Sequence, residues 1–318
     1  MNTKTRALSE SSLVTALICV MGVAGMYLPI LGIFAYFTCA PLIILGKSHG
    51  LKYAATSLVA AALIIGMFAG PMYTITLVLI SGLSSTVMGW LLHKQKTAYQ
   101  ALGAGIVVAL IGAVGAVAFG QIITGLPLIE TIKSTFDESL KIQQSMFGSV
   151  GTDQAVLSDV ALKMQQMKEQ LLLMIPGMMI MTATLTTFIN YKIAMAILKK
   201  MKKPIPYMAP FKEFALPKTV LWGTLVIYGL AMLVSYLRII DEKVLFANLQ
   251  IIMVYTFAVQ GLSVIVWYMQ RRSMAKVVRI LIFAFIVFSS MGTYILFMIG
   301  IIEVAFQIRR RIEARDSQ

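Results

Sequence analysis

The sequence offers few side chains that could carry out chemistry inside a membrane. Between Glu10 and Glu130 there is no aspartate or glutamate, and Glu303 is the only acid near the middle of a long apolar run. Buried carboxylates and histidines are the groups that relay protons in membrane transporters. Transport driven by a proton gradient is therefore disfavoured.

Sequence motifs of enzymes are also missing. There is no HExxH, no GxSxG and no GxxxxGK[ST] motif, so neither a zinc protease, a serine hydrolase nor a P-loop ATPase is indicated. Cys19 and Cys39 lie in apolar runs without a CxxC or Cys/His cluster, which argues against a disulfide framework or a zinc site. The sequence predicts no enzyme, no cofactor and no metal. Active transport would need another protein as its source of energy.

The elements around these residues are long apolar blocks. The chain has 318 residues, 59% of them hydrophobic and 13% charged, whereas soluble domains carry roughly 25% charged residues. About 20 apolar residues cross a bilayer as a helix. The first such run is too long for the apolar part of a signal peptide, so we expect it to be retained. The predicted spans are 8–28, 30–45, 51–69, 72–92, 99–124, 171–198, 219–240 and 244–269.

The fold class is therefore all-α, a polytopic integral membrane helix bundle with about 8–10 spans. The last apolar stretch, 280–308, has basic residues at both ends. It is short for two full spans, and it predicts either a hairpin of two short helices turning at Ser289–Thr293 or one long kinked helix. We favour the hairpin, because it leaves both basic ends on the cytoplasmic side.

One segment, 125–170, is polar and interrupts the apolar blocks. Apolar residues recur at helical spacing over 129–140 and again over 157–167, and Gly148–Asp153 carries turn residues between them. We predict an amphipathic helical hairpin outside the membrane core, serving either as an ordered connector or as a lid.

Positive charge predicts orientation rather than nucleic-acid binding. The net charge is +14, but the lysines and arginines lie in short loops at the ends of apolar runs. This is how cytoplasmic loops are marked, whereas a nucleic-acid site gathers basic residues on one face. We expect a multi-pass protein of the cell membrane with a cytoplasmic N-terminus, the lipid bilayer as partner and no nucleic acid. Interfacial aromatic residues are expected at Trp90, Tyr99, Tyr191 and Tyr207.

Small and polar residues mark helix faces within the spans. Polar groups are costly in lipid, so they are expected to face the bundle. The residues concerned are Ser81, Ser84, Ser85, Thr86, Thr182, Thr184, Thr186, Thr187 and Asn190. In the first span a stripe of small residues recurs every four positions. It consists of Ser12, Ala16, Val20 and Ala24, and it predicts helix docking, either within this chain or with a partner.

A small-molecule pocket is expected at the outer ends of the third to sixth spans. Tyr73, Gln121 and Glu130 lie there, and small-molecule sites combine an apolar lining with a few polar groups. These three residues are the candidate substrate-binding residues, and the stripe in the first span is the candidate docking face.

Several stretches resemble known families. The Ala16 stripe, Pro41–Gly46 before the tight loop Lys47–Gly50, Gly70-Pro71 and the glycine-rich fifth span make the first 200 residues resemble the substrate-binding S component of energy-coupling factor transporters. Gln260–Val264 and Gly300–Arg309 make the whole chain resemble the YybS-like family of bacterial membrane proteins, a family related to those S components. That family often has aspartate at the position of Glu303.

The resemblance implies a bundle that binds a solute on its outer side. In S components a transmembrane coupling protein docks on the first helices, and a pair of ATPases drives reorientation. This chain departs from them in the insertion at 125–170 and in the spans after the sixth. The predicted domains are an S-component-like core (1–200) containing that insertion, a basic cytoplasmic loop (201–218) and a C-terminal transmembrane extension with a basic tail (219–318).

Two functions follow from the sequence. The first is a membrane protein that binds or helps to translocate a small solute without its own ATPase. The alternative is a scaffold or regulator that binds partner proteins and no solute. In that case its contact surfaces would be the basic cluster Lys199–Lys203 and the arginine tail, Arg309–Arg311.

Overall fold

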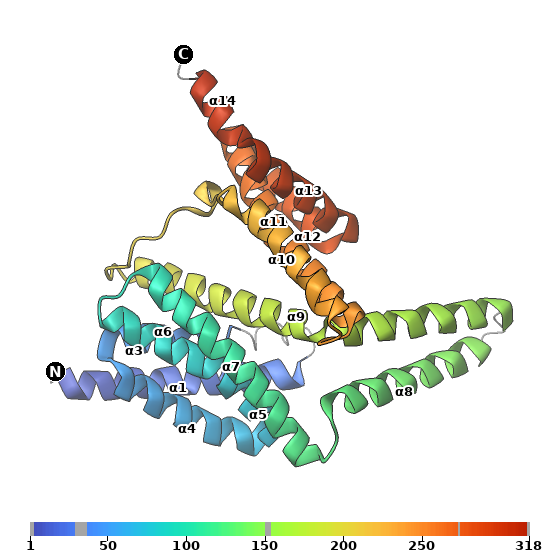
Figure 1. The fold of residues 1–318 in the computed structure, drawn as a ribbon. Helices are drawn as coiled ribbons and strands as arrows, with labels where there is room; N and C mark the ends of the chain where they lie inside the picture. Colours follow the sequence, from blue (N-terminus) through green and yellow to red (C-terminus); the bar gives the residue numbers. More distant parts are fainter. Residues whose placement is uncertain (1–2, 29–36, 150–153, 273, 317–318) are drawn as a thin grey trace. The chain divides into compact units, whose positions relative to one another are not determined.

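The computed structural model describes residues 3–28, 37–149, 154–272 and 274–316, which are helical throughout apart from short connections (Figure 1). No backbone group can be left unpaired in lipid, and a helix pairs them all internally. Seven of the described helices are long and apolar enough to cross a membrane. The number of candidate spans rises to eight if the sharply bent pair Lys276–Ile286 and Met291–Phe306 is counted as one more span. The predicted polytopic helix bundle is confirmed.

The chain divides into two compact units. The N-terminal unit comprises Met1–Ser158 and Met179–Met208, and the C-terminal unit comprises Asp159–Met178 and Ala209–Gln318. Helix α9, Gln154–Lys200, contributes residues to both units. The functional division into 1–200, 201–218 and 219–318 stays a prediction.

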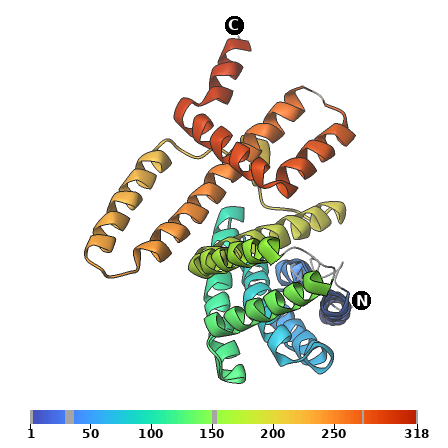
Figure 2. The ribbon, with the colours of Figure 1, turned by 90° about the vertical axis from the view of Figure 1, so that its right-hand side faces the viewer.

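Short, tightly connected helices build the N-terminal unit. Helix α4 packs against α1 and α3, and α6 packs against α3 and α7. Gly50 and Gly70 reverse the chain with φ angles of 87° and 79°, which glycine adopts without steric cost. The elements are α1 (Thr3–Tyr27), α3 (Ala40–His49), α4 (Leu51–Ala69), α5 (Pro71–Leu77), the π-helical turn η2 (Val78–Gly82), α6 (Leu83–His93), α7 (Ala98–Thr124) and α8 (Leu128–Ser149) (Figures 1 and 2).

Two predicted elements of this unit fall partly outside the described residues. The predicted second span covers 30–45, of which 30–36 is not described. The described part belongs to the ten-residue helix α3, which by itself is shorter than a bilayer requires. Both arms of the predicted amphipathic hairpin are helical, as α8 and the beginning of α9, and their pairing stays a prediction. Its turn at 150–153 lies outside the described residues.

Polar residues of the spans mostly face the bundle, as expected. Ser81, Ser84, Ser85, Thr86, Thr186, Thr187 and Asn190 are all buried. The expectation is wrong for Thr182, which is exposed. A helical hydroxyl can bond to the carbonyl of the preceding turn, as Thr184 does with Ile180 at 2.8 Å. Tyr191 is also misassigned, because it is 1% exposed in an apolar cluster rather than interfacial.

The C-terminal unit is built around one long helix, α11, which makes its most extensive contact with α13. Asp241 caps α11 by accepting hydrogen bonds from the backbone N–H groups of Lys243 and Val244. Besides residues 159–178 of α9, the unit contains the 3₁₀ turn η3 (Phe211–Glu213), α10 (Thr219–Tyr236), α11 (Glu242–Arg271), α12 (Lys276–Phe288), α13 (Ser290–Phe306) and α14 (Ile308–Asp316) (Figure 2).

The last apolar stretch breaks where the sequence predicts a turn. Helices α12 and α13 meet at an angle of 101°, and Ser289 between them caps α13 by accepting a hydrogen bond from the Gly292 N–H at 2.9 Å. The side of the membrane on which the C-terminus lies stays a prediction.

Within the C-terminal unit, a side chain of α11 forms hydrogen bonds with backbone groups of α9. Pro176 lies inside this helix, where it has no N–H to donate and its ring crowds the preceding turn. Next to it, the Gly177 N–H donates to Asn248 Oδ1 at 2.6 Å. Asn248 Nδ2 in turn donates to the Leu173 carbonyl at 2.8 Å. The Asn248 amide is thus inserted into the hydrogen-bond ladder of α9, an arrangement that bends helices.

We expect Asn248→Leu to destabilise the protein by about 1–3 kcal/mol, the cost of leaving buried donors and acceptors unpaired. The free energy of unfolding in mixed micelles, measured by titration with a denaturing detergent, checks this value. Gln250→Leu is the matched control, because Gln250 is exposed on the same helix. Equal free energies for the two variants would contradict the role assigned to Asn248.

Candidate functional site

The two late stretches Gln260–Val264 and Gly300–Arg309, far apart in sequence, meet where α11 crosses α13. A Cβ atom on Gly261 would overlap the Leu296 carbonyl oxygen, and one on Gly300 would overlap the Phe257 carbonyl oxygen. Small residues permit such close approach of two backbones in a membrane. The contact brings Gln260 and Ser263 of α11 beside the end of α13.

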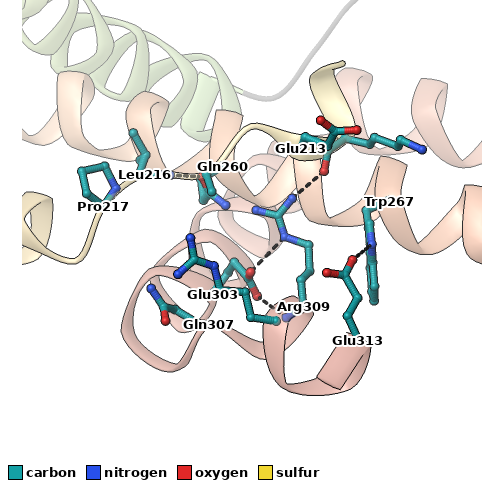
Figure 3. A pocket seen from close by; sticks show the side chains of 12 residues that line it. Glu213, Leu216, Pro217, Gln260, Trp267, Glu303, Gln307, Arg309 and Glu313 are labelled. Atoms are coloured by element: carbon teal, nitrogen blue, oxygen red, sulfur yellow. Dashed lines mark hydrogen bonds and ion pairs between the residues drawn. The ribbon is translucent and has the colours of Figure 1, made fainter. Parts of the chain in front are cut away.

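Glu303 and Arg309 form a buried ion pair at this crossing (Figure 3). On one continuous helix, residues six apart would point roughly 240° away from each other. Gln307 prevents this, because its left-handed φ of 50° ends α13 and starts α14 in a new direction. Arg309 Nε then donates to Glu303 Oε1 at 2.9 Å, and the Arg309 backbone N–H donates to Oε2 at 3.3 Å. Both residues are 6% exposed.

Three further donors of the Arg309 side chain bond to the η3 region and to Ser263. Nη1 donates to the Lys212 carbonyl at 2.6 Å and to Ser263 Oγ at 3.1 Å. Nη2 donates to the Phe214 carbonyl at 2.8 Å. A buried ion pair is tolerated when its other polar atoms are also hydrogen-bonded, and here every nitrogen of the guanidinium donates at least one hydrogen bond. The pair therefore fixes three segments to one another: η3, α11 and the α13–α14 junction.

A cavity of about 310 Å³ opens beside this ion pair. Gln260, 1% exposed, faces it. Gln260 Oε1 accepts a hydrogen bond from the Leu216 N–H at 2.8 Å, which fixes the orientation of the amide. Its Nε2 has no hydrogen-bond partner among the described residues. The other lining residues are Lys212, Glu213, Ala215, Leu216, Pro217, Trp267, Glu303, Gln307, Arg309, Arg310 and Glu313 (Figure 3).

This arrangement is suited to binding rather than to acid–base chemistry. Glu303 is paired with Arg309 at 2.9 Å, so its carboxylate already has a protein partner. A buried amide N–H without a partner indicates a bound water or ligand, and the cavity volume lies at the lower end of small-molecule sites. Among the described residues, no group of three or more His, Cys, Asp or Glu side chains could hold a metal ion.

The residues predicted to bind a solute lie in the N-terminal unit instead. Tyr73 of α5 is half-buried, and its hydroxyl donates to the Gly22 carbonyl at 2.8 Å. Gln121 near the end of α7 and Glu130 in the first turn of α8 are exposed. The Met72 side chain lies 3.2 Å from the position of a Cβ on Gly120, so the start of α5 and the end of α7 share one end of the unit. A solute pocket at that end stays a prediction.

The predicted docking stripe points away from the rest of the N-terminal unit. Ser12, Ala16 and Val20 are exposed and Ala24 is half-buried, whereas Ser11, Ile18 and Cys19 on the other face of α1 are buried. The alternative that this stripe packs within its own unit is therefore not supported for its first three residues.

Sequence reasoning missed Arg309 and Gln260 as site residues. Both residues were noted as parts of the stretches Gln260–Val264 and Gly300–Arg309, which resemble a family. The available signal was the acid Glu303 in an apolar run, since an intramembrane acid requires a nearby partner.

The fold and the polar pocket define a multi-pass helical membrane protein. The chain belongs to the family described as Predicted membrane protein (DUF2232), whose sequence profile matches residues 16–304. It is similar to the "Uncharacterized protein YybS" of Bacillus subtilis (strain 168), with 23% identity over 321 residues, which cover 98% of this chain and 99% of that protein. No solved structure matches the chain. The resemblance to the YybS-like family is confirmed.

Proposed function

We propose that the protein binds, or helps to translocate, a small polar solute and has no ATPase or other enzymatic activity of its own. The observation that carries the proposal is the buried Gln260 amide, which belongs to the cavity lining and whose Nε2 has no hydrogen-bond partner among the described residues. A ligand oxygen that accepts from Nε2 would satisfy one of the two N–H donors of this amide.

The cavity wall narrows the chemical class of the solute. Its lining includes the cationic residues Lys212 and Arg310 and the acidic residues Glu213 and Glu313, so the cavity wall carries charges of both signs. Trp267 adds an aromatic surface while its indole N–H donates to Glu313 at 2.9 Å. A zwitterion or a neutral polar molecule suits this wall better than an ion with one strong charge.

The source of energy would be external, as the resemblance to S components implies. In this proposal a transmembrane coupling protein docks on Ser12, Ala16, Val20 and Ala24, a pair of ATPases supplies the energy, and the N-terminus is cytoplasmic. The exposure of the first three of these residues supports a surface that is free for docking.

Co-purification tests the proposal. Mild detergent extraction followed by mass spectrometry should recover a small molecule with the wild-type protein. Gln260→Glu should reduce its amount about tenfold or more, because the new carboxylate keeps an acceptor for Leu216 but offers no N–H to the ligand. Gln270→Glu, at an exposed position of α11, is the control and should retain the molecule.

The solute proposal is abandoned if nothing is retained and if vitamins, nucleobases and amino acids all fail to shift the melting temperature. The second candidate, a scaffold that binds partner proteins, is favoured by the exposed stripe on α1. It predicts stoichiometric partner proteins in the same preparation, and their loss with Ala16→Trp. Recovery of an ATPase pair together with a retained solute would support the first candidate.

A further inference from the structure

Basic side chains from three segments surround a second cavity, in the N-terminal unit. Its volume is about 500 Å³. Arg6 comes from the start of α1, Lys47 from the last turn of α3 and Lys203 from the chain that follows α9. Leu198 and Pro204 contribute an apolar wall. The cavity therefore combines cationic groups with an apolar surface.

The acid at this cavity does not neutralise all of the cations. Glu10 is shared between Arg6, at 2.9 Å from its Nε, and His49, at 2.8 Å from its Nε2. His49, in the last turn of α3, is thus a partner of Glu10. Lys203 donates to Ser48 Oγ at 2.9 Å, and Lys47 has no carboxylate partner among the described residues. Positive charge remains in excess.

The two lysines are held close enough to affect each other. Burial, and then the charge of Lys203, keep the pKa of the Lys47 ammonium below its usual value. A lowered pKa of a lysine means that the fold disfavours its charged form. An anion between the two ammonium groups would remove this penalty, because it attracts both charges.

A neighbouring cavity of about 460 Å³ shares Lys47 and Pro204 with the first. Lys96 adds another cation, and Tyr99 and Tyr207 line it with 59% and 79% of their surface exposed. Tyrosines at the ends of membrane helices lie at the level of lipid head groups. The adjoining site therefore offers contacts for the polar part of a lipid as well as for a phosphate.

We propose that Lys47 and Lys203, together with Arg6, bind the phosphate of an anionic phospholipid head group that extends into the cavity lined by Lys96, Tyr99 and Tyr207. Basic pockets between membrane helices bind phosphate-bearing head groups in this way. This lipid site is separate from the solute cavity of the C-terminal unit and does not depend on the function proposed for it.

The test uses the full-length protein in detergent, titrated with phosphatidylglycerol and, as a reference, with phosphatidylcholine. Native mass spectrometry counts bound lipid, and tryptophan fluorescence follows the melting temperature. Lys47→Gln/Lys203→Gln should weaken phosphatidylglycerol binding about tenfold or more, since hydrogen bonds to charged groups are lost. Lys199→Gln/Lys200→Gln removes the same charge at exposed positions of α9 and should leave binding unchanged.

Three outcomes would overturn the proposal. Equal weakening in both double variants would show general attraction of lipid to a basic surface. Stabilisation by inorganic phosphate as strong as that by phosphatidylglycerol would assign the site to a free anion. If the first double variant does not fold, Lys47→Gln alone decides, because it leaves the bond between Lys203 and Ser48 in place. Undiminished binding in that variant would refute the site.

Discussion

Arg309→Leu is expected to destabilise the protein by about 3–5 kcal/mol, the range found when one partner of a buried ion pair is removed. The variant leaves the Glu303 carboxylate, 6% exposed, without its counter-charge. It also removes the donors to the Lys212 and Phe214 carbonyls, which tie η3 to the α13–α14 junction. The free energy of unfolding in mixed micelles measures this effect, and retained solute should be lost with it.

A double variant distinguishes the cost of an unpaired buried charge from the cost of losing the side-chain contacts. Glu303→Leu/Arg309→Leu removes both charges, and replacing a whole buried pair by apolar residues is far less costly than breaking it. We therefore expect the double variant to be more stable than Arg309→Leu. Arg311→Leu, at an exposed position two residues further on, is the control for charge alone. An Arg309→Leu protein as stable as this control would show that the pair contributes little.

The second large effect is expected from adding one methyl group at the α11–α13 crossing. Gly261→Ala would place its Cβ against the Leu296 carbonyl oxygen, and Gly300→Ala would place its Cβ against the Phe257 carbonyl oxygen. Backbone atoms cannot rotate away as a side chain can, so the two helices must separate. Overpacking typically costs about 1–3 kcal/mol and occasionally more. We expect each variant at the upper end of this range, measured by the same unfolding titration.

On α10, the same glycine-to-alanine substitution should not lower the free energy of unfolding. A Cβ on Gly223 or Gly229 would meet no atom within 4 Å, and alanine is favoured over glycine within a helix by roughly 0.5–1 kcal/mol. Gly223→Ala is therefore expected to leave stability unchanged or to raise it slightly. If Gly300→Ala and Gly223→Ala behave alike, the close contact between α11 and α13 does not hold in the membrane protein.

Local patterns were sufficient to predict the helices. Apolar length predicted spans such as 51–69 and 99–124, which match α4 and α7 within a residue. The turn residue Ser289 marked the break between α12 and α13. These features depend on short stretches of sequence, where hydropathy and capping act directly.

The candidate site could not be predicted from local patterns, because it depends on contacts between segments that are distant in the sequence. Glu303 could be recognised as an acid in need of a partner, but its partner is reached only through the left-handed conformation of Gln307. A non-glycine residue gives no sequence signal for that conformation. The carbonyl groups of Lys212 and Phe214 are backbone atoms, so no residue type marks them as ligands of Arg309.

The insertion of Asn248 into the ladder of α9 has a consequence for biosynthesis. Gly177 and Asn248 are 71 residues apart, so the ribosome completes the part of α9 around Pro176 well before it supplies this amide. During that interval the Gly177 N–H and the Leu173 carbonyl can pair only with each other or with water, since lipid offers no partner. Helix α9 therefore takes its Asn248-bridged form only when α11 arrives, which orders the assembly of the C-terminal unit in time.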